Sequence, residues 1–229
     1  MPFAFAVNHQ STSRAQEIVE LAIGYGLILI TVWTRNPEQR FFYWSAFAWI
    51  AVTGWLSRDR SRPIGLGIKN LGRSLWIVVA ATALLFVGLG IAARVHSLHR
   101  LYGPLPFGVH ILEYSLWALM QQYILQVYVL LRLLRLGMGR ASAVALATLL
   151  FAIVHIPNPV LVPAVLLWGA ASCLLYLRYR NLYPLALAHG MLGMCLAVCV
   201  PNALHHHLRV GIGYLDYPSH RHGLAVTSR

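Results

Sequence analysis

Charged residues are scarce in this sequence. Asp, Glu, Lys and Arg together make up 10% of the 229 residues, whereas 59% of the residues are hydrophobic and the mean hydropathy is +0.64. A soluble domain carries roughly a quarter of its residues as charged side chains. The composition therefore excludes an ordinary soluble protein and predicts an integral membrane protein, with the lipid bilayer as its first partner.

Acidic residues are the scarcest of the charged ones, with 6 Asp and Glu against 18 Lys and Arg. A strongly basic chain first suggests nucleic acid as a partner. The arginines, however, flank apolar segments and do not gather on one polar domain. That placement is typical of residues that set membrane topology and contact lipid headgroups, so we expect no nucleic-acid partner.

Cysteines and targeting signals are also few. Cys173, Cys195 and Cys199 are an odd number without metal-type spacing, and all three lie in apolar segments. We interpret them as buried free thiols. The first 14 residues lack a basic stretch followed by a cleavage site, so no cleavable signal peptide is expected.

Apolar segments, in contrast, follow one another along most of the chain. A membrane-spanning helix needs about 20 mostly apolar residues. Seven segments approach or reach that length, and we expect an all-α integral membrane protein of about seven transmembrane helices. The expected spans are residues 15–34, 41–57, 75–93, 109–133, 142–158, 159–178 and 182–200.

The loops between these spans predict an orientation. Counted over alternate loops, 11 of the 18 Lys and Arg fall on the side of the N-terminus and of the basic loop 58–74. The positive-inside rule then places these segments in the cytoplasm and the tail from Pro201 on the opposite side. We expect the protein in a bacterial inner (cell) membrane with its N-terminus cytoplasmic.

Polar side chains within three of the expected spans need an explanation, because polar groups in hydrocarbon are costly. Gln121, Gln122 and Gln126 lie in the fourth span, His155 lies in the fifth and His189 lies in the seventh. A single Gln is often a bond between helices, and a single His near a Pro-containing turn is often a packing residue. The similar depth of these residues favours a shared polar cavity, with Gln121, His155 and His189 within about 8 Å of one another, a spacing that one water can bridge.

The order of these residues resembles the CPBP family, also called the Abi or CAAX prenyl-protease-like family of intramembrane proteases. That family carries Glu-Glu-x-x-x-Arg on one helix, Phe-x-x-x-His on the next and His-x-x-x-Asn on a later one. "QQYILQ" stands at the first motif, Phe151 and His155 match the second, and His189 begins the third. The resemblance covers about residues 109–200 and implies a CPBP-like helical core there. It divides the chain into N-terminal membrane helices and a basic loop (1–108), the core (109–200) and a His-rich polar tail (201–229).

At the motif positions where this sequence departs from the family pattern, each residue is uncharged. Gln121 and Gln122 replace the two glutamates, Gln126 replaces the arginine and Gly193 replaces the asparagine of the third motif. An amide cannot act as a base, although it donates and accepts hydrogen bonds. Losing the negative and the positive partner together leaves no unpaired buried charge, so the site is neutral as a whole.

Glu113 is the one carboxylate between the N-terminal third and the tail. It stands two helical turns before Gln121, about 12 Å along the axis, and shares a stripe with Trp117 and Gln121. It either lines the same cavity nearer the membrane face or lies at the interface, solvated or paired with Arg94 or Arg100.

The tail carries His205, His206 and His207 in succession, and consecutive residues do not face one way on a helix. The run is either a surface feature, or the apolar stretch after it folds back over the cavity mouth and brings a His and Asp216 near the site.

Three functions remain open. The first is a divergent intramembrane hydrolase, nominally an endopeptidase, with His155 or His189 as the base and Gln121 and Gln122 orienting water or the oxyanion. The second is a pseudoprotease that binds a lipid, a prenyl group or a transmembrane segment. The third is different chemistry on an isoprenoid or lipid. The candidate cavity residues are Glu113, Trp117, Gln126, Phe151 and Gly193. The cofactor and the metal content are unknown from the sequence, because two histidines without a clear third ligand make a weak metal site.

Overall fold

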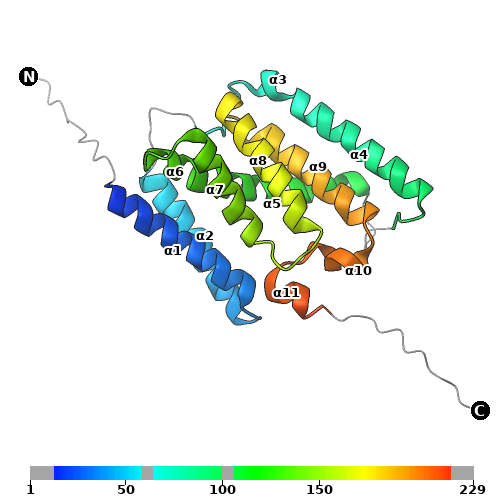
Figure 1. The fold of residues 1–229 in the computed structure, drawn as a ribbon, viewed down its shortest axis with the longest axis horizontal. Helices are drawn as coiled ribbons and strands as arrows, with labels where there is room; N and C mark the ends of the chain where they lie inside the picture. The colour runs from blue at the N-terminus through cyan, green and yellow to red at the C-terminus, as the bar shows by residue number, and fades with distance from the viewer. Residues whose placement is uncertain (1–12, 58–63, 100–105, 218–229) are drawn as a thin grey trace, which may run out of the picture.

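The fold is helical throughout the part of the chain that the computed structural model describes, which is residues 13–57, 64–99 and 106–217 (Figure 1). Two non-α segments interrupt the α-helices: a π-helical segment, η1, and a short 3₁₀ segment, η2. In chain order the elements are α1 (Arg14–Trp33), α2 (Glu38–Leu56), α3 (Leu71–Ser74), α4 (Trp76–Arg94), α5 (Phe107–Gln122), η1 (Tyr123–Leu130), α6 (Leu131–Arg135), α7 (Arg140–Ile153), α8 (Leu161–Tyr179), α9 (Tyr183–Cys199), α10 (Asn202–His205), η2 (His206–Leu208) and α11 (Gly211–Leu215).

Each of the seven apolar segments expected from the sequence is helical. The fourth is built from α5, η1 and α6, which follow one another without a break. The fifth is shorter than expected and ends at Ile153, because the chain turns at residues 154–160. Asn158 stabilises the turn that leads into α8, since its side-chain oxygen accepts from the backbone N–H groups of Val160 and Leu161, both at 3.0 Å.

Three helices of the described residues are long and apolar enough to cross a membrane: Arg14–Trp33, Leu71–Arg94 and Leu161–Tyr179. A fourth span results if Tyr183–Cys199 and Asn202–Leu208, bent by 119°, are counted together. The expected number of seven is therefore not reached by length and composition. One reason is that α7 has 14 residues, about 21 Å at 1.5 Å per residue, against roughly 30 Å of hydrocarbon.

The main helix contacts join α5 to α9, α4 to α9, α7 to α8 and α1 to α2. In Figure 1 the α1–α2 hairpin lies along one side of the bundle, α4 lies along the other, and α7, α8 and α9 lie between them. Two glycines bring α9 close to α5: a Cβ on Gly190 would collide with Ser115, and one on Gly193 would collide with the ring of Tyr114. Small residues of this kind let membrane helices approach closely.

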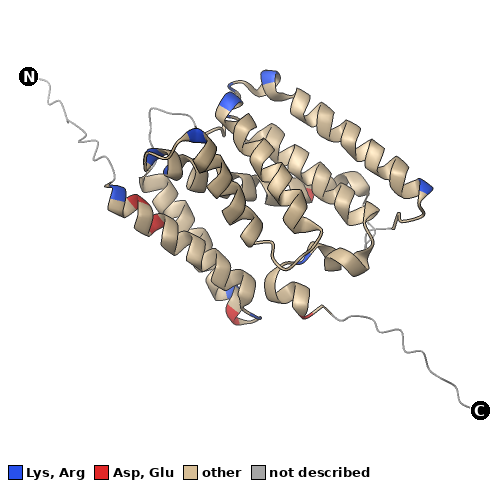
Figure 2. Ribbon diagram, in the orientation of Figure 1, with Lys and Arg blue, Asp and Glu red and all other residues tan. Residues whose placement is uncertain are grey.

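The basic loop and the tail lie at opposite ends of the bundle. The loop joins the α8–α9 connection, where the Leu182 N–H donates to the Gly65 carbonyl (2.9 Å). The tail joins the α7–α8 connection, where the Gly211 N–H donates to the Ile156 carbonyl (2.9 Å). Figure 2 shows Lys and Arg at the ends of the helices and in the connecting segments. Residues 58–63 of the loop lie outside the described part of the chain.

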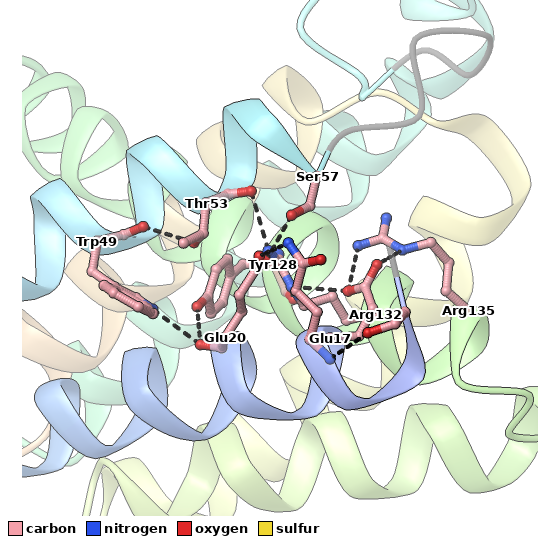
Figure 3. Close-up of polar contacts among 10 residues, drawn as sticks. Glu17, Glu20, Trp49, Thr53, Ser57, Tyr128, Arg132 and Arg135 are labelled. Carbon is pink, nitrogen blue, oxygen red and sulfur yellow. Dashed lines mark hydrogen bonds and ion pairs between the residues drawn. The ribbon is translucent and has the colours of Figure 1, made fainter. Parts of the chain in front are cut away.

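A buried ion-pair cluster attaches the α1–α2 hairpin to the continuous helix α5–η1–α6, residues 107–135, which we call the central helix (Figure 3). Arg132 Nη2 lies 2.6 Å from the Glu20 carboxylate, and Arg132 Nε lies 3.1 Å from that of Glu17. Arg135 pairs with the other oxygen of Glu17 at 2.7 Å, and the Ser57 hydroxyl donates to Glu20 at 2.7 Å. Arg132 is 1% exposed, so the cluster is an internal contact and not a surface pair.

Candidate functional site

A cavity of about 1270 Å³ lies between the α1–α2 hairpin and the helices α5, η1 and α7. Most of its wall is apolar, with aromatic and aliphatic side chains from both sides, while polar side chains gather toward the tail. Five of the residues predicted for the site line it: Glu113, Trp117, Gln121, Phe151 and His155. The other four, Gln122, Gln126, His189 and Gly193, lie outside this lining.

His155 is held in one orientation in the turn after α7. Its Nδ1 lies 2.7 Å from the backbone oxygen of Phe151, and its ring packs edge-on against the Phe151 ring with centroids 4.8 Å apart. A carbonyl oxygen can only accept a hydrogen bond, so Nδ1 of the neutral imidazole carries the hydrogen. Nε2 is left with a free lone pair, which is the form of histidine that can accept a proton.

His189 projects from α9 into a nest of aromatic rings. The centroids of Phe151, Trp168 and Tyr114 lie 6.1, 6.0 and 6.3 Å from its own. Phe151 therefore contacts both histidines. The Nδ1 of His189 lies 3.3 Å from the amide nitrogen of Gln122.

The amides of the central helix are hydrogen-bonded to one another. The Gln126 amide nitrogen donates to Gln122 Oε1 (3.0 Å) and to the Ser172 hydroxyl on α8 (3.0 Å). Gln122 ends α5, Gln126 lies in η1, and both are 0% exposed. π-helical turns occur often at functional sites, and this one carries the last amide of the set.

Gln121, His155 and His189 were predicted to share one cavity, and the structure gives the contacts of each. Gln122 contacts His189, whereas Gln121 lies with His155 on the cavity wall. Gln121 Oε1 is buried without a hydrogen-bond partner among the described residues. The separation of about 8 Å between Gln121, His155 and His189 stays a prediction.

The remaining predicted site residues, Glu113, Trp117 and Gly193, each contact a residue near the cavity or the α5–α9 interface. The Glu113 side chain is 58% exposed and lies 3.6 Å from His110 Nδ1, so it faces a histidine one turn away; Arg100 lies outside the described residues. Trp117 stacks on Tyr43 of α2 with centroids 6.3 Å apart. Gly193 lies at the α5–α9 contact beneath Tyr114, where a larger side chain does not fit.

The tail folds back over one end of the cavity, as one reading of the sequence anticipated. His205, His207, Arg209 and Asp216 are part of the cavity lining. Arg35 at the end of α1 makes two bonds of 2.6 and 2.8 Å to Asp216, and these hydrogen bonds hold the pKa of that carboxyl below its usual value.

Sequence reasoning missed two residues that hold this arrangement, Asn158 and Ser172. The amide nitrogen of Asn158 donates to the carbonyls of His205 and Arg209, both at 2.9 Å, and so fixes the tail. Asn158 stands in the turn "IPNP" after α7, but a single Asn does not reveal a partner about fifty residues away. Within the described ranges, no group of three or more His, Cys, Asp or Glu could hold a metal ion.

The fold and this site define an α-helical membrane protein in which two histidines meet at one phenylalanine ring beside an internal cavity. Residues 103–195 match the family model described as type II CAAX prenyl endopeptidase Rce1-like. This segment is similar to the Rce1-like (CPBP/Abi) family of intramembrane proteases, and the resemblance predicted from the motifs is confirmed for it. The searches of curated proteins and of solved structures gave no match.

Proposed function

We propose that the protein is a divergent intramembrane endopeptidase in which His155, and not a glutamate, activates water. The family description names CAAX prenyl endopeptidases, so the proposed substrate is a prenylated peptide or another membrane-inserted peptide. Its apolar part would occupy the cavity between the α1–α2 hairpin and α5.

The observation that carries the proposal is the bond between His155 Nδ1 and the Phe151 carbonyl. It leaves Nε2 unprotonated on a ring that lines the cavity. A neutral imidazole held this way is a suitable general base near neutral pH. Gln121 supports it, because its unpartnered oxygen can accept a hydrogen bond from the attacking water.

The proposed reaction uses groups of this chain alone. Nε2 of His155 removes a proton from water while the water oxygen bonds to the carbonyl carbon of the scissile peptide bond. The resulting imidazolium then gives that proton to the leaving nitrogen as the C–N bond breaks. A carboxylic acid and an amine are formed, and His155 returns to its neutral form.

The test is cleavage of a prenylated CAAX-type peptide by the protein in lipid nanodiscs. Wild type should release the C-terminal fragment, His155→Ala should release none, and His96→Asn should cleave like wild type. His96 is exposed and outside the cavity lining, and its positive φ of 56° suits Asn. A wild type that binds the peptide and the membrane-inserted controls without cleaving any of them would overturn the proposal.

A binding-only pseudoprotease is the second candidate. It is favoured by the amides of Gln122 and Gln126, which occupy family carboxylate and arginine positions and bond to each other and to Ser172. In that case the cavity would hold a lipid, a prenyl group or a transmembrane segment. The same assay separates the two, because a pseudoprotease retains binding in wild type and in His155→Ala and cleaves in neither.

The membrane arrangement is part of the proposal. We propose seven crossings, made by α1, α2, α4, α5–η1–α6, α7, α8 and α9, with the loop 58–74 in the cytoplasm. The helical state of all seven segments supports it, as do the opposite ends occupied by loop and tail. In this arrangement α1, α2 and α4 lie against the core 109–200, and residues 201–217 of the tail close one end of the cavity.

A further inference from the structure

We infer that Ser172, Gln126 and Gln122 form a directional hydrogen-bond relay that fixes His189 with its hydrogen on Nε2. The Nε2 of His189 is then a hydrogen-bond donor and not a second base. The relay itself is independent of any activity. Its catalytic consequence rests on the proposed function.

The donor and acceptor roles in the relay follow from the backbone carbonyl of Gly169, because a carbonyl oxygen can only accept a hydrogen bond. The Ser172 hydroxyl donates to the Gly169 carbonyl at 3.2 Å. Because its hydrogen is used there, the Ser172 oxygen accepts from the neighbouring amide. Gln126 must therefore present its NH₂ group to Ser172, and the distance is 3.0 Å.

The same assignment of donors and acceptors continues through Gln126 and Gln122 to His189 on α9. The NH₂ group of Gln126 also donates to Gln122 Oε1 at 3.0 Å, which turns the nitrogen end of Gln122 toward His189. That nitrogen lies 3.3 Å from Nδ1. An NH₂ group can only donate, so Nδ1 accepts and the single hydrogen of the neutral ring stands on Nε2.

Burial keeps the relay in one arrangement. Gln122, Gln126 and Ser172 are each 0% exposed, so water does not compete for their hydrogen bonds. Polar networks in a low-dielectric interior are strengthened when each member is oriented by the next. Here the members come from three helices, α5–η1, α8 and α9.

The amide of Gln122 determines which ring nitrogen of His189 carries the hydrogen. A carboxylate there would accept a hydrogen bond from Nδ1–H and leave Nε2 with a lone pair, which is how a carboxylate usually orients a histidine base. An amide nitrogen imposes the opposite tautomer. His155 and His189 consequently have complementary forms, one with an acceptor at Nε2 and the other with a donor.

The test is ¹⁵N NMR of the histidine rings in nanodiscs, with the His189 signals identified by their loss in His189→Gln. Wild type should show an unprotonated Nδ1 and a protonated Nε2. Gln122→Glu should move the hydrogen to Nδ1, and the near-isosteric Gln126→Met should give a mixture of tautomers while the protein stays folded. A wild type with hydrogen on Nδ1, or a Gln126→Met variant with an unchanged tautomer, would overturn the relay.

Peptide cleavage by the same variants separates the relay from the proposed function. If both hold, Gln122→Glu should lower kcat roughly 10²–10³-fold, the usual loss of one donor directed at an oxyanion, with KM nearly unchanged. The predicted tautomers without cleavage by wild type would support the relay and overturn the endopeptidase. Cleavage by wild type with unchanged kcat in Gln122→Glu would contradict the donor role of His189.

Discussion

At the scale of single residues, the three amides of the central helix divide into two groups. Gln121 lies on the cavity wall with a free oxygen, whereas Gln122 and Gln126 are internal and bonded. Leucine at these positions would cost less in a membrane helix. Gln122 and Gln126 are explained by directed hydrogen bonds that an apolar side chain cannot make.

Gln121 is the residue at which a restored carboxylate is most informative. Gln121→Ala should reduce peptide cleavage by roughly 10²–10³, because a group directed at the reacting atoms is removed. Gln121→Glu should also lower activity, since a carboxylate in this largely apolar wall either stays protonated or destabilises the bundle. Cleavage rates and melting temperatures in detergent measure both effects. Higher activity in Gln121→Glu than in wild type would indicate a dormant glutamate protease.

The motif residues of the site could be predicted from the sequence, whereas the residues that hydrogen-bond to the site and to the tail could not. Phe151, His155 and His189 follow from motif spacing, and the structure brings all three together. Ser172 and Asn158 were not predicted, because a single small polar residue carries no signal of which distant helix or tail it contacts. The identity of the amide facing His189 depends on helix rotation, which the widened turn of η1 alters.

At the scale of elements, the α1–α2 hairpin is attached at one end by the buried ion pairs of Arg132 and at the other by the exposed pair of Arg35 and Asp216. The exposed pair contributes little to stability. The buried cluster is sensitive to removal of one partner, because an unpaired charge remains inside. The apolar patterning that predicted α1 gave no reason to pair its glutamates with residues more than a hundred positions away.

Arg132→Met should lower the free energy of unfolding by about 3–5 kcal/mol, because Glu20 loses its cation. The double variant Glu20→Gln/Arg132→Met should be more stable than Arg132→Met, while Glu17 keeps its bond to Arg135. The measurement is reversible unfolding in mixed micelles. Arg140→Met is the matched control, since Arg140 is exposed at the start of α7, and its effect should stay within about 0.5 kcal/mol. Additive losses in the double variant would mean that the two side chains do not interact.

The tail should loosen in acid. Burial holds the pKa of His205 below its ordinary value of 6.5. Its Nε2 bonds the Val200 carbonyl (2.9 Å), while Nδ1 accepts from the Leu208 N–H (3.1 Å). Protonation places a hydrogen on Nδ1, so that Nδ1 can no longer accept the hydrogen bond from the Leu208 N–H. Because the folded pKa is the lower one, the stabilisation is present above pH 6.5 and is lost as the pH falls through the folded value.

Hydrogen–deuterium exchange of residues 205–216, corrected for intrinsic rates, measures this effect. Protection should fall between about pH 7 and pH 5 in wild type and change less in His205→Asn. The ring of His99 stacks on that of His205, and His207 also lies near His205, so His99→Gln and His207→Gln are included as controls. Equal pH dependence in wild type and His205→Asn would assign the change to another group.

At the scale of the whole molecule, the placement of loop and tail at opposite ends predicts that they lie on opposite sides of the membrane. Gly67 and Gly213 suit single cysteines, because a Cβ at either meets no atom within 4 Å. In a background without Cys173, Cys195 and Cys199, a membrane-impermeant maleimide should label the two variants from opposite sides of sealed vesicles. Labelling from the same side would show that the number of crossings between them is even.

The most direct measurement of the central claim is an experimental structure of the protein in nanodiscs with a non-hydrolysable prenylated peptide. The prenyl chain should lie in the cavity between the α1–α2 hairpin and α5. The isostere of the scissile bond should lie within one water molecule of His155 Nε2 and next to Gln121. A peptide bound elsewhere, or bound in the cavity with that bond remote from His155, would contradict the account.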